Sequence, residues 1–306
     1  MDLKAVKKAV KLIPRAFCRL RYALAKPGGE KYVLAVVVIV KNEERYIREW
    51  LEYHRLAGIG HVYLYDNGST DRTPEYVRGY EREGFVTMTH FPGRGMQAQA
   101  YNDALKKYGK DCRCMAFIDA DEFLFSIDPE KKVPEVVEEL LTACPEASGL
   151  AVNWAMFGSC GFDRRPEAGG VLSNYIYRAE PGKPGTDCIK TIAKPGAVFR
   201  YNHPHFPEYM LGGFSVDESG RRTEGWRNPA PDPVKLRINH YFTKSREEWD
   251  ERRKLGKADQ KDAKNVRTAE EFIRHDNNDI FDDSMSAYAA AIEERIGNTV
   301  YEANGS

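Results

Sequence analysis

MAFIDADEF, residues 115–123, joins an apolar run to two carboxylates, Asp119 and Asp121, with one small residue between them. The apolar run predicts a buried strand. Because strand side chains alternate between faces, the two aspartates converge only where the chain leaves the sheet. Carboxylates at such a strand end are suitable ligands for a hard divalent cation, which in turn holds phosphates. The alternative is that Asp119 caps the following segment and Asp121 faces water.

Strands and helices alternate in the sequence up to this stretch. Strands are expected at residues 33–40, 61–65, 86–90 and 114–118, and helices at residues 43–56, 73–83 and 96–108. This order predicts right-handed crossovers and an α/β fold with a mainly parallel sheet. Three polar clusters follow expected strands, at residues 41–43, 66–71 and 119–122. Because ligands bind beyond the carboxyl ends of such strands, this convergence favours a ligand site over isolated turns.

The composition is that of a globular protein without a charge bias. The 306 residues are 42% hydrophobic and 30% charged, and the formal net charge is zero. This balance gives no reason to expect a nucleic acid as partner. The longest apolar run, residues 33–40, is well short of the roughly 18 apolar residues that a membrane span needs. The six cysteines show no Cys-x-x-Cys spacing, which favours reduced thiols and a cytoplasmic location.

Residues 1–29 differ from the rest of the chain in charge and periodicity. Up to residue 26, eight lysines and arginines face a single acid, Asp2, and apolar residues recur at steps of three and four. The pattern predicts a basic amphipathic helix followed by a linker. Such a helix lies on an anionic membrane surface, as in a peripheral protein of the inner face, or packs on the protein body or on a partner chain. Pro14 weakens the helical pattern, and the interspersed lysines and arginines are unlike a secretory signal.

Residues 34–125 resemble glycosyltransferases of the GT-A fold, and among these the group around glycosyltransferase families 2 and 92. Three motifs carry the resemblance in the right order, namely KNE at residues 41–43, DNGSTD at 66–71 and DAD at 119–121. Further on, NWAMFGSCG at 153–161 and INHYFTKSREEW at 238–249 are similar to the family-92-like branch. The resemblance implies a Rossmann-like, mixed but mainly parallel sheet flanked by helices. It also implies a metal-dependent enzyme that transfers a sugar from a nucleotide diphosphate sugar.

The resemblance divides the chain into three parts. Residues 1–29 are the basic helix and linker, residues 30–244 the GT-A catalytic domain, and residues 245–306 a C-terminal helical extension. Within the catalytic domain, residues 30–130 would bind the nucleotide sugar and residues 131–244 the acceptor. The acceptor half is expected to hold short strands at 150–153, 174–178 and 189–193 among Gly, Pro and aromatic residues.

The resemblance also implies roles for the polar clusters. Asp119 and Asp121 would hold Mn²⁺ or Mg²⁺, which would stabilise the leaving diphosphate as a Lewis acid. His240 is the first choice to complete the metal site, ahead of His203 and His205. Asp66 would accept a hydrogen bond from the nucleobase, which favours a uridine diphosphate sugar. The other candidates for donor contacts are Asn42, Glu43, Arg94, Gln97, Asn102 and Asp119.

Several of these residues have a simpler interpretation. Asn42 and Glu43 are compatible with capping of the following helix. The DNGSTD segment at 66–71 is compatible with a plain turn. Arg94, between two glycines, is equally compatible with a solvent-exposed loop. The alternatives for Asn42 and Arg94 concern local structure alone, whereas a turn at 66–71 would itself present Asp66 to a ligand.

The general base has no clear motif. Inverting transfer, which the resemblance implies, requires a carboxylate within hydrogen-bond reach of the acceptor hydroxyl. Many relatives place it in a Glu-Asp pair, which the second half of this chain lacks. Asp163, Asp187 and Glu208 are the candidates, and a surface acid is the alternative for each. The acceptor would be a carbohydrate or a lipid-linked molecule.

Three other classes share part of the pattern. A phosphatase of the haloacid dehalogenase type also has Asp-x-Asp at a strand end, but normally on its first strand. A sugar nucleotidyltransferase of the same fold needs a Gly-rich loop with a basic residue after the first strand, where this chain has KNE at residues 41–43. A catalytically inactive GT-A-like binding module at a membrane is the third alternative, because the base motif is missing.

Overall fold

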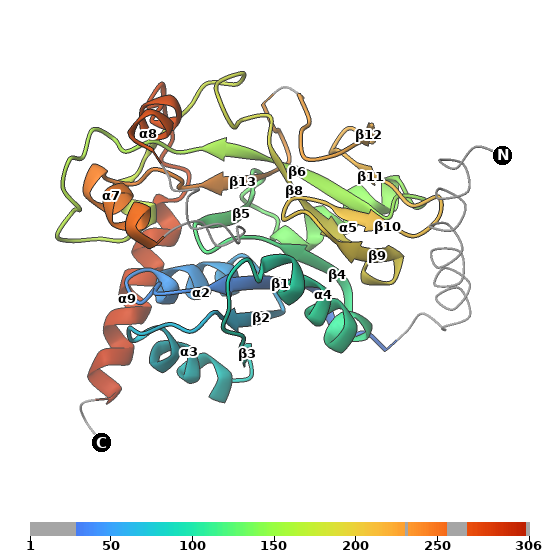
Figure 1. The fold of residues 1–306 in the computed structure, drawn as a ribbon, viewed down its shortest axis with the longest axis horizontal. Coiled ribbons are helices and arrows are strands. Elements are labelled where there is room, and N and C mark those ends of the chain that lie inside the picture. Colours follow the sequence, from blue (N-terminus) through green and yellow to red (C-terminus); the bar gives the residue numbers. More distant parts are fainter. Residues whose placement is uncertain (1–28, 230–231, 256–267, 304–306) are drawn as a thin grey trace.

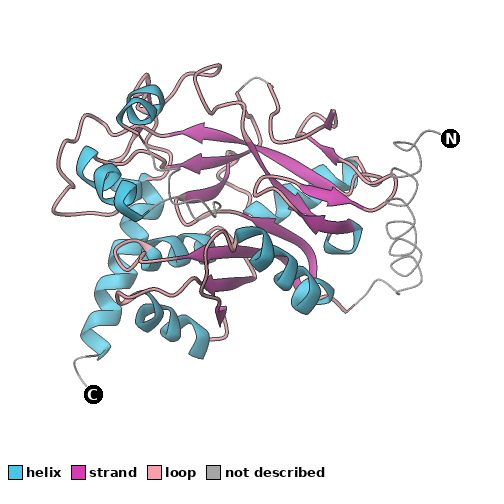
Figure 2. Cartoon of the chain, viewed as in Figure 1, coloured by secondary structure: helices cyan, strands magenta, loops and turns pink. Residues whose placement is uncertain are grey.

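The computed structural model describes residues 29–229, 232–255 and 268–303. Within these ranges a ten-stranded mixed sheet runs through the molecule and helices pack against it (Figures 1 and 2). Its strands are β1 (Tyr32–Val40), β2 (His61–Asp66), β3 (Val86–His90), β4 (Cys112–Phe117), β5 (Glu122–Ser126), β6 (Gly149–Met156), β8 (Ile189–Ala193), β11 (Ser215–Val216), β12 (Arg222–Thr223) and β13 (Leu236–His240). The predicted α/β class, with a mixed but mainly parallel sheet flanked by helices, is confirmed.

The main path of the sheet has the strand order β12-β11-β6-β8-β4-β1-β2-β3, and β13 joins β6 to β5. β1 is parallel to β2 and β4, and β2 is parallel to β3. β8 is antiparallel to both β4 and β6, so β4 and β6 run in the same direction. β13 is parallel to β6. The carboxyl ends of β1, β2, β3, β4, β6 and β13 therefore lie at one edge of the sheet, which we call the carboxyl edge.

The helices connect the strands and cover both faces of the sheet. They are α2 (Ile47–Leu56), α3 (Thr73–Arg82), α4 (Gln97–Tyr108), α5 (Val133–Ala143), α6 (Val171–Asn174), α7 (Arg246–Leu255), α8 (Ala269–His275) and α9 (Ser286–Ala303). Two small sheets pair β9 (Val198–Tyr201) with β10 (Pro207–Tyr209) and β7 (Tyr177–Arg178) with β14 (Ile280–Phe281). Of the strand expected at residues 174–178, only Tyr177–Arg178 is a strand, because α6 ends at Asn174 and residues 175–176 belong to no helix or strand.

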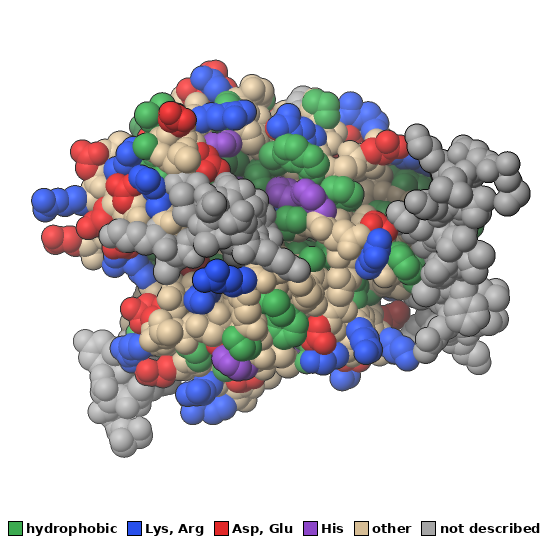
Figure 3. Space-filling model, viewed as in Figure 1, with side chains coloured by type: hydrophobic (Ala, Val, Ile, Leu, Met, Phe, Trp, Pro, Cys, Tyr) green, Lys and Arg blue, Asp and Glu red, His purple; other side chains and the backbone are tan. Residues whose placement is uncertain are grey.

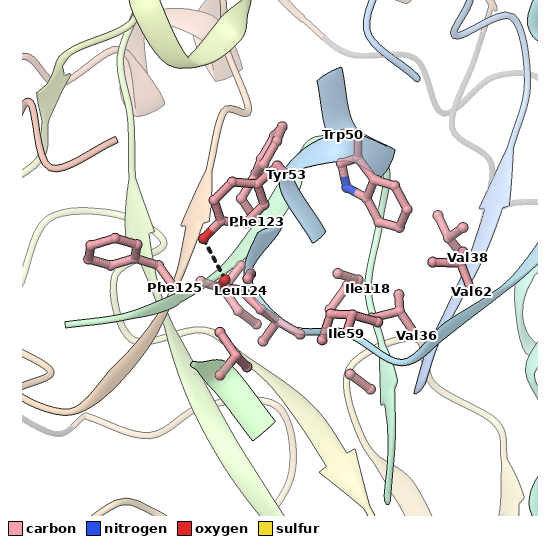
Figure 4. Close-up of a cluster of buried hydrophobic side chains, with 14 of the residues drawn as sticks. Val36, Val38, Trp50, Tyr53, Ile59, Val62, Ile118, Phe123, Leu124 and Phe125 are labelled. Atoms are coloured by element: carbon pink, nitrogen blue, oxygen red, sulfur yellow. Dashed lines mark hydrogen bonds between the residues drawn. The ribbon is translucent and has the colours of Figure 1, made fainter. Parts of the chain in front are cut away.

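The alternating faces of β1 separate two apolar cores. Val36 and Val38 point to the larger core, which contains Trp50 of α2 and side chains of α3, α5 and α9 (Figure 4). Val37, between them, points to a smaller core under α4. In the larger core the Tyr53 hydroxyl donates to the carbonyl of Leu124 at 2.7 Å, so the polar group of this buried side chain is hydrogen-bonded. Near-continuous burial of β1 is what a strand covered on both faces requires.

The C-terminal helix α9 shares the larger core. α9 packs against α2 and crosses it in Figure 1, and its residues Ala289 and Ile292 belong to the same buried cluster as β1. Nε of Arg295 also donates to a carboxylate oxygen of Glu52 on α2, at 2.8 Å. α9, the last helix of the predicted extension, is therefore packed against the sheet domain.

The predicted basic helix at residues 1–26 falls outside the described residues. Within the described ranges, no helix combines the length and the hydropathy that crossing a membrane requires. Five cysteines in these ranges are free thiols, as expected, and the sixth, Cys18, lies outside them.

Candidate active site at the carboxyl edge

The strand directions bring polar side chains from six strands to the carboxyl edge. β8 is antiparallel to β4 and β6, so its amino end lies at the carboxyl edge. It contributes its second residue, Lys190. From β2 to β13, these side chains are Asp66, Asn42, Glu43, Asp119, Asp121, Lys190, Trp154 and His240. The three polar clusters singled out in the sequence thus meet at one edge, as predicted from the strand ends.

Asp121 is buried and lies between two cationic or potentially cationic side chains. Nη1 of Arg252 on α7 lies 2.7 Å from Oδ2 of Asp121, and Nε2 of His240 lies 3.6 Å from Oδ1. Nη2 of Arg252 also reaches Oε1 of Glu43 at 3.2 Å. Burial alone would raise the pKa of the Asp121 carboxyl, but Arg252 and His240 outweigh it and hold the pKa well below its usual value. Asp121 is therefore an ionised carboxylate.

Asp119 is held by different partners. Nζ of Lys190 lies 2.9 Å from Oδ2 of Asp119, and Nε2 of Gln97 donates to Oδ1 at 2.5 Å. The Lys190 side chain is only 1% exposed and also lies 3.5 Å from Oε2 of Glu122. Burial lowers the pKa of Lys190, but the Asp119 and Glu122 carboxyls reverse this and raise it above its ordinary value. Burial in turn raises the pKa of Glu122, with Lys190 acting against it. A protonated lysine thus orients Asp119.

Asp121 and His240 have a separation that fits a shared cation. Their facing atoms are 3.6 Å apart, which is beyond a hydrogen bond but within the roughly 4.2 Å that two ligands at about 2.1 Å from one ion can span. Among the described residues, no group of three or more His, Cys, Asp or Glu side chains is arranged to hold a metal. Mg²⁺ usually takes one or two carboxylates and completes its shell with water and substrate phosphates. Asp121 could supply one such carboxylate, and His240 a nitrogen ligand, with the remaining positions left to water and phosphate.

His240 is fixed by packing. Its ring lies 4.2 Å, centroid to centroid, from the Trp154 ring on the neighbouring strand β6. Its Nδ1 is buried and has no hydrogen-bond partner among the described residues. A metal-bound histidine normally donates its second N–H to an oxygen. The protein therefore orients this imidazole by ring contact, which directs Nε2 toward Asp121.

The first two polar clusters interlock and position Asp66. The amide N–H of Asn42 donates to Oγ of Ser69 at 3.0 Å, and the Asn42 side chain accepts from the Thr70 amide at 2.8 Å. Asp66 accepts from the Ser69 amide at 3.0 Å and lies 3.2 Å from Nδ1 of His90. α2 begins only at Ile47, so the capping alternative for Asn42 is wrong. Asp66 is 4% exposed and ends β2 within this pair of loops.

The other donor candidates separate into two groups. Gln97 belongs to the site through its bond to Asp119. Asn102 instead bonds the backbone N–H and the carbonyl of Tyr201, both at 2.8 Å, and so joins α4 to β9. Arg94 is exposed on the loop before α4, which agrees with the interpretation as a solvent-exposed loop residue. The structure therefore brings Gln97 to the acid cluster and gives Asn102 a structural role.

Of the three candidate bases, the structure brings Asp187 to the carboxyl edge. Asp187 precedes β8 and forms an ion pair with Nη1 of Arg227 at 3.1 Å. Asp163 is exposed in the loop after β6. Glu208 lies in the β9–β10 hairpin, where it forms an ion pair with Nη2 of Arg200 at 3.2 Å. Asp163 follows β6, which ends at this edge, but lies seven residues beyond the strand, whereas Glu208 belongs to a separate two-stranded sheet.

Sequence reasoning missed Arg252, which α7 carries over the site. Glu248, one helical turn earlier, accepts hydrogen bonds from the hydroxyls of Tyr46, Tyr175 and Ser245 at 2.5, 2.6 and 2.6 Å. Burial raises the pKa of Glu248, but these bonds outweigh it and lower the pKa to about 2. Residues four apart lie on one face of a helix, so the anchoring of Glu248 directs Arg252 toward Asp121. Lys190 was also missed, although a lysine inside the apolar strand IKTIA, residues 189–193, was a usable signal.

The family model that matches this chain is glycosyltransferase family 92, over residues 31–275. A family 92 protein of Oryza sativa subsp. japonica is 26% identical over 179 residues, which cover 58% of this chain and 30% of that protein. One of Ricinus communis is 26% identical over 221 residues, which cover 71% of this chain and 37% of that protein. The chain thus spans less than half the length of these relatives.

The chain is also similar to solved structures at low identity. S. aureus TarS 1–349, solved in complex with UDP, is 21% identical with a TM-score of 0.36, and the match covers 54% of this chain and 47% of that one. A mycobacterial protein is 18% identical with a TM-score of 0.28, over 52% of this chain and 47% of that one. The family model covers far more than half of the sequence and agrees with the resemblance of the three motifs. The chain therefore belongs to glycosyltransferase family 92.

Proposed function

We propose that the protein transfers a sugar from a uridine diphosphate sugar to an acceptor hydroxyl, with inversion and with the help of Mn²⁺ or Mg²⁺. The observation that carries the proposal is the ionised Asp121, which faces His240 and Arg252 at the carboxyl edge where Asp66 also ends its strand. Membership of a glycosyltransferase family supports sugar transfer and argues against the phosphatase and nucleotidyltransferase alternatives.

The leaving diphosphate is the part of the reaction that needs most stabilisation. A cation bound by Asp121 and His240 would supply Lewis-acid stabilisation of the developing negative charge. Arg252 presents N–H donors in a planar fork beside the same carboxylate and would donate to phosphate oxygens. Lys190 holds Asp119 in place through its ammonium, so Asp119 keeps a fixed position for a ribose hydroxyl or for metal-bound water.

Different carboxylates would contact the nucleobase of the donor and the hydroxyl of the acceptor. Asp66 would accept the imide N–H of uracil, because its carboxylate is fixed by the Ser69 amide at the end of β2. Asp187 would take the proton of the acceptor hydroxyl, because it directly precedes β8, which begins at the carboxyl edge. The basic pattern of residues 1–26 supports a location at an anionic membrane surface, which is part of the proposal. A lipid-linked acceptor would lie at the same surface.

A thermal-shift screen of nucleotide sugars, with and without Mn²⁺, tests the donor and the metal together. A ligand that binds the folded state raises the unfolding temperature by mass action, so uridine diphosphate sugars should give the largest shift, and Mn²⁺ should increase it. Asp121→Asn should remove the Mn²⁺-dependent part. Asp283→Asn, at an exposed carboxylate before α9, is the matched control and should behave like the wild type. An equal Mn²⁺-dependent shift in Asp121→Asn would show that the metal site is wrongly placed.

The screen does not distinguish the proposed enzyme from an inactive binding module, because both bind the donor. The module predicts donor binding without turnover, whereas the proposed function predicts release of free sugar from the bound donor by slow transfer to water. Measuring uridine diphosphate release from the donor that gives the largest thermal shift separates the two. Release that depends on Asp121 supports the enzyme, and binding without release supports the module.

A further inference from the structure

Lys244 is a buried lysine between β13 and α7, and the function proposed above gives it no role. It lies four positions after His240 and is 3% exposed. Among the described residues, its Nζ forms no hydrogen bond and no ion pair, and it lies 4.9 Å from the centroid of the Tyr46 ring. Buried charges in proteins are normally paired, because burial removes the hydration of the charge. Lys244 is therefore a buried cation without a bonded anion.

The carboxylates near Lys244 are bonded by other groups. Arg252 holds Asp121 at 2.7 Å and Glu43 at 3.2 Å, and Glu248 accepts hydrogen bonds from three hydroxyls. Burial lowers the pKa of Lys244, and repulsion from Arg252 lowers it further, with Glu43, Asp121 and Glu248 acting against both. These carboxylates thus have partners without Lys244, and their combined charge does not offset the burial of its ammonium.

The backbone fixes Lys244 in an unfavourable conformation. Its φ is 52°, in the left-handed region that residues with a Cβ seldom adopt. Both neighbours are anchored, because the Thr243 hydroxyl donates to the Phe157 carbonyl at 3.3 Å and the Ser245 hydroxyl donates to Glu248 at 2.6 Å. Strained residues that the surrounding structure holds in this way cluster at ligand sites. The conformation of Lys244 is thus a second indication, beside its unpaired charge, that it serves a ligand.

The exposed charges around α7 do not form a basic patch that would compete for an anion. Over the part of the drawn face where α7 lies, Figure 3 shows acidic and basic side chains side by side. Arg246 and Arg253 pair with Asp250, at 3.6 and 3.4 Å, and Arg165 pairs with Glu251. An anion that enters beside α7 would therefore be held by buried charge rather than by the surface.

The strand order indicates which anion would meet Lys244. Along the sheet, β1, β4, β8 and β6 separate β13 from β2, whose last residue is Asp66. In the proposed function Asp66 binds the nucleobase, so the phosphate farther from the nucleoside lies farther toward β13. After Arg252 and His240, Lys244 also helps to hold down the pKa of Asp121 against the effect of burial, which places its charge near the proposed cation site. Nζ of Lys244 is not one of the fully buried polar atoms that lack a partner, so it retains contact with solvent.

We propose that Lys244 is a catalytic residue that binds the β-phosphate of the donor, as a second protein cation beside Arg252. This inference rests on the proposed transferase function and deepens it at the leaving group. When the bond between the anomeric carbon and the β-phosphate oxygen breaks, its electron pair stays on that oxygen, and the ammonium stabilises the charge while keeping its own proton. The acceptor oxygen forms the new bond to the anomeric carbon and gives its proton to the general base. The site should consequently prefer nucleoside diphosphates to monophosphates.

The test compares the binding of uridine diphosphate and uridine monophosphate to the whole chain by calorimetry, with Mn²⁺ present. Lys244→Met, which keeps the length of the side chain without its charge, should weaken diphosphate binding by at least about tenfold, the size expected for one charged hydrogen bond. Monophosphate binding should weaken by less than about twofold. Lys235→Met removes an exposed lysine just before β13 and should bind both nucleotides like the wild type. An unchanged ratio of the two affinities in Lys244→Met would overturn the inference.

The stability of the ligand-free protein distinguishes phosphate binding from a structural role. Because burial disfavours the charged lysine, Lys244→Met should unfold at the same temperature as the wild type or at a higher one. Lys244→Gln, which also removes the charge but keeps a polar end, should show the same loss of preference for the diphosphate. A lower unfolding temperature in both variants would mean that the fold itself uses the ammonium, and it would contradict the inference.

The same measurements separate failure of this inference from failure of the proposed function. A wild-type protein that binds neither uridine nucleotide would contradict the proposed donor. A wild-type preference for uridine diphosphate that persists in Lys244→Met would leave the transferase function intact and exclude Lys244 from the diphosphate site.

Discussion

Arg252 and Asp121 form an ion pair with 2.7 Å between Nη1 and Oδ2, although 131 positions separate them in the chain. The same guanidinium reaches Glu43 at 3.2 Å, so one cation joins the loops that follow β1 and β4. An arginine fork matches phosphate oxygens as well as it matches carboxylates. In the proposed reaction, Arg252 would therefore exchange its carboxylate partners for phosphate oxygens when the donor and the cation bind.

Replacing Arg252 by Ala should destabilise the metal-free protein and weaken nucleotide binding. Removing one partner of a buried ion pair costs roughly 3–5 kcal/mol, and partial solvent access to Arg252, 19% exposed, reduces our expectation to about 1–3 kcal/mol. Added Mn²⁺ should restore more stability in this variant than in the wild type, because a cation would replace the lost charge beside Asp121. Thermal unfolding with and without Mn²⁺ measures both effects. Arg253→Ala, which removes a 41% exposed partner of Asp250, is the control, and identical behaviour of the two variants would contradict the role of Arg252.

Replacing Lys190 by Met should lower stability in a way that depends on pH. The variant leaves Asp119 and Glu122 without the ammonium between them, so their carboxyls would hold protons more tightly in the folded protein. A folded-state pKa above the unfolded value stabilises at low pH and loses that contribution as the pH rises. The loss relative to the wild type should therefore be larger at pH 8 than at pH 5, as measured by urea unfolding. Lys194→Met removes an ammonium that donates to the carbonyl of Pro145 and should show no such trend.

Much of the fold follows from local patterns in the sequence. The strand at residues 33–40 and the helices and strands that follow it up to β4 lie within a few residues of their predicted positions. Hydrophobic periodicity and turn residues mark these elements in the sequence. The helix expected from residue 43 begins at Ile47, and the amides of Asn42, Glu43 and Glu44 before it donate to side chains of the 66–71 cluster and of Thr73. Contacts across about 30 positions leave no local pattern in the sequence.

The site was predictable only as far as its residues lie in motifs. Asp66, Asp119 and Asp121 follow strands directly, so the parallel sheet brings them together. Lys190 and Arg252 lie 71 and 131 positions from their aspartate partners, and no spacing rule connects them. The metal, the uridine preference and the base stay predictions, because each concerns a molecule or a proton that the fold alone does not place.

The Glu248 anchor predicts a defined acid sensitivity of α7. Its pKa falls from 4.5 to about 2 in the folded protein, a difference worth about 3 kcal/mol. Because the folded pKa is the lower one, this stability is present above pH 4.5 and is lost as the pH falls toward 2. Glu248→Gln should therefore be less stable than the wild type at pH 7, and the difference should shrink in acid. Glu247→Gln changes the adjacent exposed carboxylate and should show a small difference at every pH.

Removing the imidazole of His240 should distinguish the two candidate metals. Mn²⁺ accepts a nitrogen ligand more readily than Mg²⁺, which prefers oxygen. In His240→Ala, the affinity of the protein–nucleotide complex for Mn²⁺ should fall by at least about tenfold, while that for Mg²⁺ should fall less. Titration of each ion, followed by the nucleotide-dependent thermal shift, gives both numbers, and metal-free nucleotide binding serves as the internal control. Equal losses for the two ions would mean that Nε2 of His240 is not a ligand and that the imidazole acts by packing against Trp154 alone.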